Sequence, residues 1–285
     1  MGRFHRHDDG TGHSHDHDDH DGHDHHNHDG HHDHDGHHHD HGTGDHHDHH
    51  EDVGDHSGYE TGAERIDVLE AIFDENDRKA DANRAALNAA GVVAINLMSS
   101  PGAGKTTLLR RTLAELQGQL RCGVVEGDIA TSIDADRLSG LGAQISLLNT
   151  GLGFGGECHL DAPMVAHALA RLDLPNLDLV LIENVGNLVC PAEFDVGAHH
   201  KAMVFAVTEG EDKPLKYPVM FAAVEVVVVN KIDLLPYLDF DLELFEDNLA
   251  KINPRARAIE TCATRGDGLA EWLDWLRSLA PQPVA

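Results

Sequence analysis

The stretch "VVAINLMSSPGAGKTT", residues 92–107, decides the fold. It opens with a mainly apolar, β-branched run that is typical of a buried strand, continues through a glycine-rich loop, and leads into a helical pattern over Lys105–Leu116. The loop fits G-x-x-x-x-G-K-[ST], except that Ser99 holds the first glycine position. Strand, loop and helix in this order predict the phosphate-binding loop of a P-loop nucleoside triphosphatase.

The pattern continues to both sides of this loop. Short apolar runs alternate with helical segments, and fully apolar strands between helices indicate an α/β fold with a mostly parallel sheet and helices on both faces. We expect helices over Lys105–Leu116, Leu160–Leu172, Phe245–Ile252 and Leu269–Leu279, and strands at "VVAINLM", "GVVEG", "QISLLN", "LDLVLIE", "MVFAVT", "VEVVVVN" and "ARAIET". Ligands of such sheets bind beyond the carboxyl ends of the strands.

Residues 61–90 precede the first strand and read as one or two helices. They contain no proline, and apolar residues recur with helical spacing before Gly91, which is a plausible stop: Ile66, Leu69, Ile72 and Phe73. We therefore assign residues 61–285 to one nucleotide-binding domain with an N-terminal helical extension at 61–90.

The first sixty residues have a different composition. They hold 22 of the 26 histidines together with 15 aspartates and almost no aliphatic side chains. Such a segment cannot bury enough apolar surface to offset the entropy of ordering its backbone, so we expect residues 1–60 to be disordered without metal. Clustered imidazoles bind Ni²⁺, Zn²⁺ or Cu²⁺. A purification tag or solubilising low complexity is the alternative, but mixed His and Asp over such a length argues against a tag.

Charge and cysteine content limit the class of partner. The formal charge is −29, with 2 basic and 17 acidic residues in positions 1–60 and 19 against 33 in the rest. This charge opposes nucleic acid and anionic membranes. No apolar run approaches the roughly 18 to 20 residues of a membrane span, and no signal-peptide core is visible. We expect a cytoplasmic protein whose four cysteines are thiols or metal ligands.

The phosphate loop predicts the role of each of its residues. Gly102, Ala103 and Gly104 bring backbone N–H groups to the phosphate oxygens, and the helix N-terminus adds its dipole. Lys105 reaches the β- and γ-phosphates, the Thr106 hydroxyl binds Mg²⁺, and Thr107 belongs to the same nucleotide site.

A second motif lies about 125 residues further on, in "VVVVNKIDLL". Asn230, Lys231 and Asp233 form the N-K-x-D pattern of GTP-binding proteins. The Asp233 carboxylate can accept from guanine N1–H and the 2-amino group, and adenine lacks both donors. Four letters alone also fit a strand end and a turn. Together with a phosphate loop they favour GTP.

Acidic residues between the two motifs suit Mg²⁺ and catalysis. Asp128 follows the second expected strand, and Glu183 follows "LVLI" where a Walker-B carboxylate usually lies. Glu183-x-x-Gly186 is similar to the D-x-x-G turn whose glycine N–H senses the γ-phosphate. We take Lys105, Asp128, Glu183 and Gly186 as the catalytic set, although strand-end solvated acids are the alternative for the carboxylates.

Two thiols and an imidazole lie close to this turn in the sequence. Cys158 and His159 precede an expected helix, and Cys190 follows Gly186 by four residues. Sulfur and nitrogen donors suit Zn²⁺ or Ni²⁺ rather than Ca²⁺ or Mg²⁺. The spacing fits no recognised zinc finger, so on spacing alone separate buried thiols are the default.

Six segments together resemble the hydrogenase nickel-incorporation GTPases, the HypB family: "SSPGAGKTTLL", "EGDIATSIDADR", "CHLDA", "ENVGNLVCPAEFDVG", "EGEDKPLKYP" and "VVVNKIDLLPY". The resemblance covers roughly residue 63 to the C-terminus. It implies a SIMIBI-class GTPase that forms a GTP-promoted homodimer, with Cys158, His159 and Cys190 of both subunits as ligands at the interface. A second nickel chaperone and the hydrogenase large subunit are the implied partners, and histidine-rich extensions are associated with nickel storage.

On this interpretation Cys190 is a metal ligand on the phosphate-sensing loop. Loss of the γ-phosphate would then change the ligand geometry and the nickel affinity. We expect a slow GTPase, because no glutamine or arginine finger can be assigned; Lys213 or Lys216 contacts the nucleotide or the partner subunit, or lies in an exposed loop.

Two departures from the family pattern leave alternatives open. "NTGLGFGGECH" is a few glycine-rich residues longer than usual, and the N-terminal C-x-x-C-G-C motif of some members is absent. Cys122 and Cys262 match no ligand position, and we expect both to pack in the core or the nucleotide pocket. A urease accessory GTPase is one rival, although its C-P-H motif is missing, and a passive nickel or zinc store with a vestigial nucleotide site is another.

Overall fold

The computed structural model describes residues 5–6, 12–13, 63–127, 140–148 and 159–280. The chain divides into two units, Met1–Gly58 and Tyr59–Ala285. In the first unit, β1 (His5–Arg6) and β2 (Gly12–His13) pair antiparallel. The remainder of the predicted disordered tail lies outside the described residues.

The second unit is built on a seven-stranded sheet in the order β5-β4-β6-β3-β7-β8-β9, in which every neighbouring pair is parallel. The strands are β3 (Val93–Ser99), β4 (Cys122–Glu126), β5 (Gln144–Leu147), β6 (Leu179–Gly186), β7 (His200–Ala206), β8 (Val226–Asn230) and β9 (Arg257–Glu260). The central strands are buried on both faces, as their continuous apolar sequence requires. The predicted α/β fold is confirmed.

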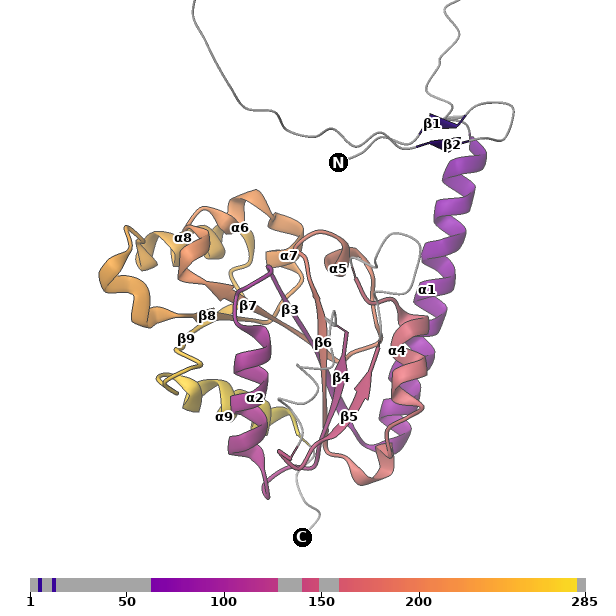
Figure 1. Cartoon of the computed structure of the whole chain (residues 1–285), viewed down its shortest axis with the longest axis horizontal. Coiled ribbons are helices and arrows are strands. Elements are labelled where there is room, and N and C mark those ends of the chain that lie inside the picture. Colours follow the sequence, from indigo (N-terminus) through magenta and orange to yellow (C-terminus); the bar gives the residue numbers. More distant parts are fainter. Residues whose placement is uncertain (1–4, 7–11, 14–62, 128–139, 149–158, 281–285) are drawn as a thin grey trace, which may run out of the picture. The chain divides into compact units, whose positions relative to one another are not determined.

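Helices cover both faces of this sheet (Figure 1). One face packs against α2 (Lys105–Leu116) and α9 (Leu269–Leu279) in a core that includes Leu109 and Trp272. The other face packs against α1 (Ala63–Ala90) and α4 (Ala162–Leu169) over β4 and β6, and against α7 (Pro218–Ala222) and α8 (Leu242–Ile252) over β7 and β8. Alternate β3 residues therefore enter different cores.

The predicted helices agree well with the structure. α2 and α9 have the expected bounds, and the region before the sheet forms one helix, α1, which ends at Ala90 where Gly91 adopts φ +70°. α4 starts later than the expected residue 160, because the Asp161 carboxylate accepts from Met164 N (2.7 Å) and caps the helix there, and it ends earlier than expected, at Leu169.

Three short helices were not predicted: α5 (Cys190–Glu193), α6 (Lys213–Lys216) and α7. Each contains a proline in its first turn and is too short to display an apolar period. Short 3₁₀ turns complete the connections: η2 (Leu174–Asn176), η3 (Val207–Glu209) and η4 (Ile232–Tyr237). Among the described helices, none has both the length and the apolar character needed to cross a membrane.

Candidate nucleotide and metal site

The phosphate loop lies between β3 and α2, at the carboxyl edge of the sheet. Gly104 immediately precedes α2 with φ +99°, a backbone conformation that side chains disfavour. A Cβ atom on Gly104 would lie 2.4 Å from Asn230 Nδ2, and that amide donates to Ala103 O at 2.9 Å. The loop is therefore packed directly against the end of β8.

Lys105, Thr106 and Glu183 form a polar cluster under the loop, in which Lys105 and Glu183 are buried. Lys105 Nζ lies 3.3 Å from Ser99 Oγ and 3.9 Å from Glu183 Oε1, and Thr106 Oγ1 donates to the same carboxylate oxygen at 2.7 Å. Glu183 is fully buried, and its Oε2 atom has no hydrogen-bond partner within the described ranges. A buried carboxylate oxygen beside a threonine hydroxyl fits Mg²⁺, which prefers oxygen ligands.

The N-K-x-D residues lie beside the same loop. Asn230 is buried, and its Oδ1 atom accepts from Ala263 N at 3.0 Å. Lys231, in the left-handed region at φ 65°, donates from Nζ to Gly102 O at 2.7 Å. These contacts join the expected base-reading segment to the phosphate loop.

Asp233 is held by two donors of the loop "TCATRGDG". The Cys262 thiol donates to Asp233 Oδ1 at 3.1 Å, and Arg265 Nη2 lies 3.4 Å from Oδ2. The Cys262 hydrogen bond, assisted by Arg265, lowers the pKa of Asp233 and favours the ionised carboxylate that guanine recognition requires. Cys262 therefore lies beside the expected base-reading carboxylate, whereas Cys122 lies in the core.

A hollow of about 620 Å³ opens between the phosphate loop and the segment after β6. A Cβ atom on Gly186 would lie 3.1 Å from Pro101 Cα, so a larger residue would crowd the phosphate loop. The lining includes Ser100, Pro101, Gly186, Val189, Glu209 and Lys213.

Glu209 was not singled out in the sequence. Its Oε2 atom accepts from Ser100 Oγ and lies 3.5 Å from Lys213 Nζ, and its Oε1 atom accepts from Ala206 N at 3.0 Å. Lys213 is therefore at the hollow, whereas Lys216 is exposed and pairs with Asp212 at 2.6 Å. A carboxylate beside a helix start gives no spacing signal that distinguishes it from a solvated one.

The structure describes two of the three candidate nickel ligands, Cys190 and His159. Cys190 begins α5, and the His159 ring packs against Phe194 with centroids 4.1 Å apart. Phe194 in turn packs against Phe73 of α1 at 5.1 Å. Cys158 and Asp128 lie outside the described residues, and within those residues no three His, Cys, Asp or Glu side chains are grouped as a metal site requires.

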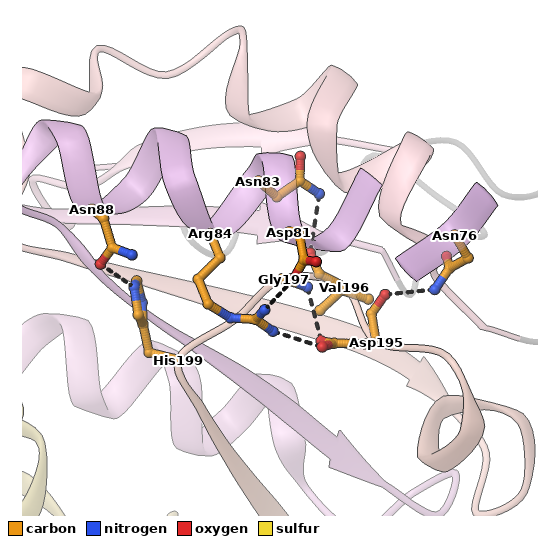
Figure 2. Close-up of polar contacts among 9 residues, drawn as sticks. All are labelled: Asn76, Asp81, Asn83, Arg84, Asn88, Asp195, Val196, Gly197 and His199. Atoms are coloured by element: carbon orange, nitrogen blue, oxygen red, sulfur yellow. Dashed lines mark hydrogen bonds and ion pairs between the residues drawn. The ribbon is translucent and has the colours of Figure 1, made fainter. Parts of the chain in front are cut away.

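Figure 2 shows how α1 holds the segment that follows α5. Asn76 Nδ2 donates to Asp195 O (2.9 Å), Asn83 Nδ2 donates to Val196 O (3.1 Å), and Arg84 pairs with the Asp195 carboxylate (2.6 Å). A Cβ atom on Gly197 would lie 2.4 Å from Ala80 O, so helix and segment approach closely. We call these α1 contacts to residues 195–197 the α1 clasp.

The clasp also reaches the segment that carries His159. Asn76 Oδ1 accepts from Ala162 N at 2.9 Å, and Asn83 Nδ2 donates to Ala162 O at 2.9 Å. The two asparagines thereby join the start of α4 to residues 195 and 196. Both are nearly completely buried, which makes these bonds costly to break.

Fold and site together define a P-loop nucleotide-binding protein. The CobW/HypB/UreG nucleotide-binding domain family matches residues 93–260. The hydrogenase maturation factor HypB of Escherichia coli K12 is 47% identical over 229 residues, which are 80% of this chain and 78% of that protein. The chain belongs to the HypB family of hydrogenase maturation factors.

Other similar proteins have been characterised in sequence or structure. A hydrogenase/urease maturation factor HypB from Helicobacter hepaticus is 38% identical, over 76% of this chain and 89% of that protein. The crystal structure of HypB from Archaeoglobus fulgidus matches with a TM-score of 0.66 and 39% identity, covering 72% of this chain and 98% of that one. HypB from Helicobacter pylori in complex with nickel gives a TM-score of 0.66 and 33% identity, covering 74% of this chain and 100% of that one.

Proposed function

We propose that the protein is a GTP-hydrolysing nickel metallochaperone that stores Ni²⁺ and delivers it for maturation of [NiFe]-hydrogenase. One observation carries the proposal: a single segment, Glu183 to Cys190, contains both a carboxylate bonded to Thr106 of the phosphate loop and a thiol suited to nickel. The family's name supports the hydrogenase, and the nickel in the H. pylori HypB structure supports the metal.

The proposed reaction converts GTP and water to GDP and phosphate. Asn230 and Asp233 select guanine, residues 102–107 bind the phosphates, and Lys105 offsets charge on the β- and γ-phosphates. Thr106 and Glu183, with Asp128, would hold Mg²⁺, which neutralises charge on the phosphates when bound. Gly186 senses the γ-phosphate, and Asp128 is our candidate for orienting the water. Turnover should be low.

Nickel is the cargo rather than a resident cofactor in this proposal. Cys158, His159 and Cys190 supply sulfur and nitrogen donors that suit Ni²⁺ and also Zn²⁺. We propose that these donors meet at the interface of a GTP-promoted homodimer. The exposed apolar side chains of Val189, Leu215 and Val219 support such an interface near the phosphate hollow.

We expect the protein to act in the cytoplasm with a second nickel chaperone and the hydrogenase large subunit as partners. The relative from H. hepaticus, named a hydrogenase/urease factor, favours a second candidate function, nickel delivery to urease. Passive nickel or zinc storage is the remaining alternative, and measurable GTP turnover would exclude it.

The test compares Ni²⁺ affinity in GDP with that in a non-hydrolysable GTP analogue, with residues 1–56 removed so that tail histidines do not mask the site. We expect the two affinities to differ in the wild type, and the difference to disappear in Cys190→Ala. Light scattering in the same two nucleotides reports dimerisation. Equal affinities in the wild type would refute the coupling.

The tail is tested separately. Deleting residues 1–56 should greatly lower the number of nickel ions bound per chain while GTP turnover stays nearly intact, because the phosphate loop and the N-K-x-D segment lie beyond residue 90 and bind each other directly. Loss of turnover on this deletion would contradict a separate storage role.

A further inference from the structure

Asn184 occupies the position directly after Glu183 and is completely buried. Its Oδ1 atom accepts from Leu160 N at 3.1 Å and from Val185 N at 2.9 Å, and its Nδ2 atom donates to Asn96 Oδ1 at 3.2 Å. The side chain therefore joins the end of β6 to the backbone one residue beyond His159, which the motifs did not predict.

The two ends of this connection have different chemistry. On one side, Glu183 accepts from Thr106 in the phosphate loop, and Gly186 lies against Pro101. On the other side, Leu160 is fully buried and follows the candidate nickel ligand His159 directly. Asn184 is thus a short, buried link between the phosphate side and the metal side.

The α1 clasp fixes the backbone on the far side of this link. Asn76 and Asn83 bind the backbone of Ala162, two residues beyond Leu160. They also bind residues 195 and 196, which follow Cys190 (Figure 2). Because Ala162 is fixed from the helix side, a shift of Asn184 changes the backbone at residues 159–160 and is not absorbed by movement of α4 as a whole.

We propose that Asn184 is the positioning residue that transmits the nucleotide state to His159, through its hydrogen bond from Leu160 N. A γ-phosphate that accepts a hydrogen bond from Gly186 N–H shifts the segment 183–186. The hydrogen bond from Leu160 N to Asn184 transmits this shift to the imidazole of His159. The inference rests on the proposed function, since it concerns how nucleotide and nickel affinities depend on each other.

The test measures the ratio of Ni²⁺ affinities in GDP and in a non-hydrolysable GTP analogue, in the full-length protein and with the tail contribution fitted as separate weak sites. For the wild type we expect a ratio of about fivefold or more in either direction. In Asn184→Ala the ratio should fall to within about twofold of one. GDP affinity should change little, because the side-chain hydrogen bonds of Asn184 join it to Leu160, Val185 and Asn96, none of which is a proposed nucleotide ligand.

Asn184→Asp serves as the conservative variant, because it keeps the oxygen that accepts from Leu160 N and loses the donor to Asn96. It should retain most of the wild-type ratio. Asn184→Ser takes the place of Asn184→Ala if the alanine variant does not fold, since its hydroxyl is too short to span to Leu160.

Asn253→Ala is the matched control. Asn253 is also buried, and its Nδ2 atom donates to Phe221 O (3.0 Å) and Val224 O (2.8 Å), away from the phosphate loop. It should lose stability like Asn184→Ala but keep the affinity ratio, so a general loss of packing cannot imitate the expected result.

The outcomes distinguish a failure of the inference about Asn184 from a failure of the proposed coupling. Equal nickel affinities in the wild type would refute the proposed coupling of nucleotide and nickel, on which the inference rests. A wild-type difference that persists in a folded Asn184→Ala or Asn184→Ser protein would overturn the role of Asn184. So would a loss of the difference in Asn253→Ala. Hydrogen exchange of the peptide containing Leu160 gives a nickel-free check: its protection should depend on the nucleotide in the wild type and not in Asn184→Ala.

Discussion

The proposed base pocket, formed by Asn230, Lys231 and Asp233, and the proposed metal face, which contains His159 and Cys190, are held in different ways. In the base pocket, motif residues bind one another directly: Asn230 donates to Ala103 O, and Lys231 donates to Gly102 O. On the metal face, His159 and the segment after Cys190 depend on Phe194 and on the α1 clasp, which lie outside any ligand motif. Damage to one region should therefore spare the other, except through the few residues that connect them.

The largest effect should follow Asp233→Asn, which changes the base pocket alone. The amide presents one acceptor and adds a donor opposite the guanine 2-amino group, so GTP affinity should fall about 10³-fold or more. Xanthosine triphosphate, which carries an oxygen at that position, should bind better than GTP. Calorimetry with both nucleotides measures this change of preference from GTP to xanthosine triphosphate. The nickel affinity of the nucleotide-free protein should stay the same. Retained GTP preference would show that Asp233 does not read the base.

Cys190→Ala changes the metal face alone. Loss of a ligand should exceed the 10- to 100-fold effect of losing an outer-shell partner, so we expect nickel affinity to fall by about 100-fold with residues 1–56 removed. GDP affinity should be unchanged. Equilibrium competition with a chelator of known nickel affinity gives the value.

Cys122→Ala is the matched control for that variant. Burial, and secondarily Asp178, raises the pKa of Cys122 to about 12, so this thiol stays protonated at neutral pH and is a poor ligand. Its removal should leave nickel affinity within about twofold of the wild type, given that only thiolates bind the metal well. Equal losses in both variants would mean that nickel affinity reports stability rather than ligation.

Breaking the clasp should have a moderate effect on the whole domain. Asn83→Ala leaves the carbonyls of Ala162 and Val196 without their donor in a buried setting, which should lower the free energy of unfolding by about 1 to 3 kcal/mol. Urea denaturation measures this. Arg78→Ala, which removes an exposed pair with Glu75, should cost less than about 1 kcal/mol. A similar cost for both would argue that the clasp is not a structural anchor.

The same contrast explains what the sequence predicts well. The base pocket is specified by short motifs, because a tight turn needs Gly104 and a base-reading carboxylate needs a fixed distance from its strand. The order of strands and helices likewise follows from continuous apolar runs. The bounds of α2 and α9 agreed because Gly104 and Gly268 mark both helix starts.

The contacts that hold the metal face leave no such pattern in the sequence. Asn76 contacts Asp195 across 119 positions of the sequence, and an asparagine on a helix looks the same whether it is buried or solvated. Asn184 lies inside the motif "ENVG" as an unspecified residue. Glu209 and Phe194 lie inside segments that carry the family resemblance, but no spacing rule gives either residue a role. Their partners are set by tertiary packing, which single-residue spacing does not encode.

The smallest expected effect is a pH dependence at the C-terminal end of α1, beyond the clasp. His199 Nδ1 accepts from Ala94 N at 2.9 Å, and its Nε2 atom lies 3.0 Å from Asn88 Oδ1, so the neutral ring joins α1 to β3 (Figure 2). Burial, followed by the nearby His200 and Arg84, lowers the pKa of His199.

A lowered folded-state pKa means that the unfolded chain takes up the proton first as the pH falls. The contribution of His199 to stability is therefore complete above the unfolded pKa of about 6.5 and is lost as the pH falls below it. Because protonation removes the acceptor for Ala94 N–H, the loss should amount to about 1 kcal/mol. Urea denaturation at pH 7.5 and 5.5 measures it as the difference between wild type and His199→Gln, since the tail histidines contribute equally to both. His167→Gln provides the control, because the exposed His167 contacts Arg171 and is not among the groups that lower the pKa of His199. If His199→Gln keeps the full pH gradient, the connection between α1 and β3 does not depend on the neutral imidazole.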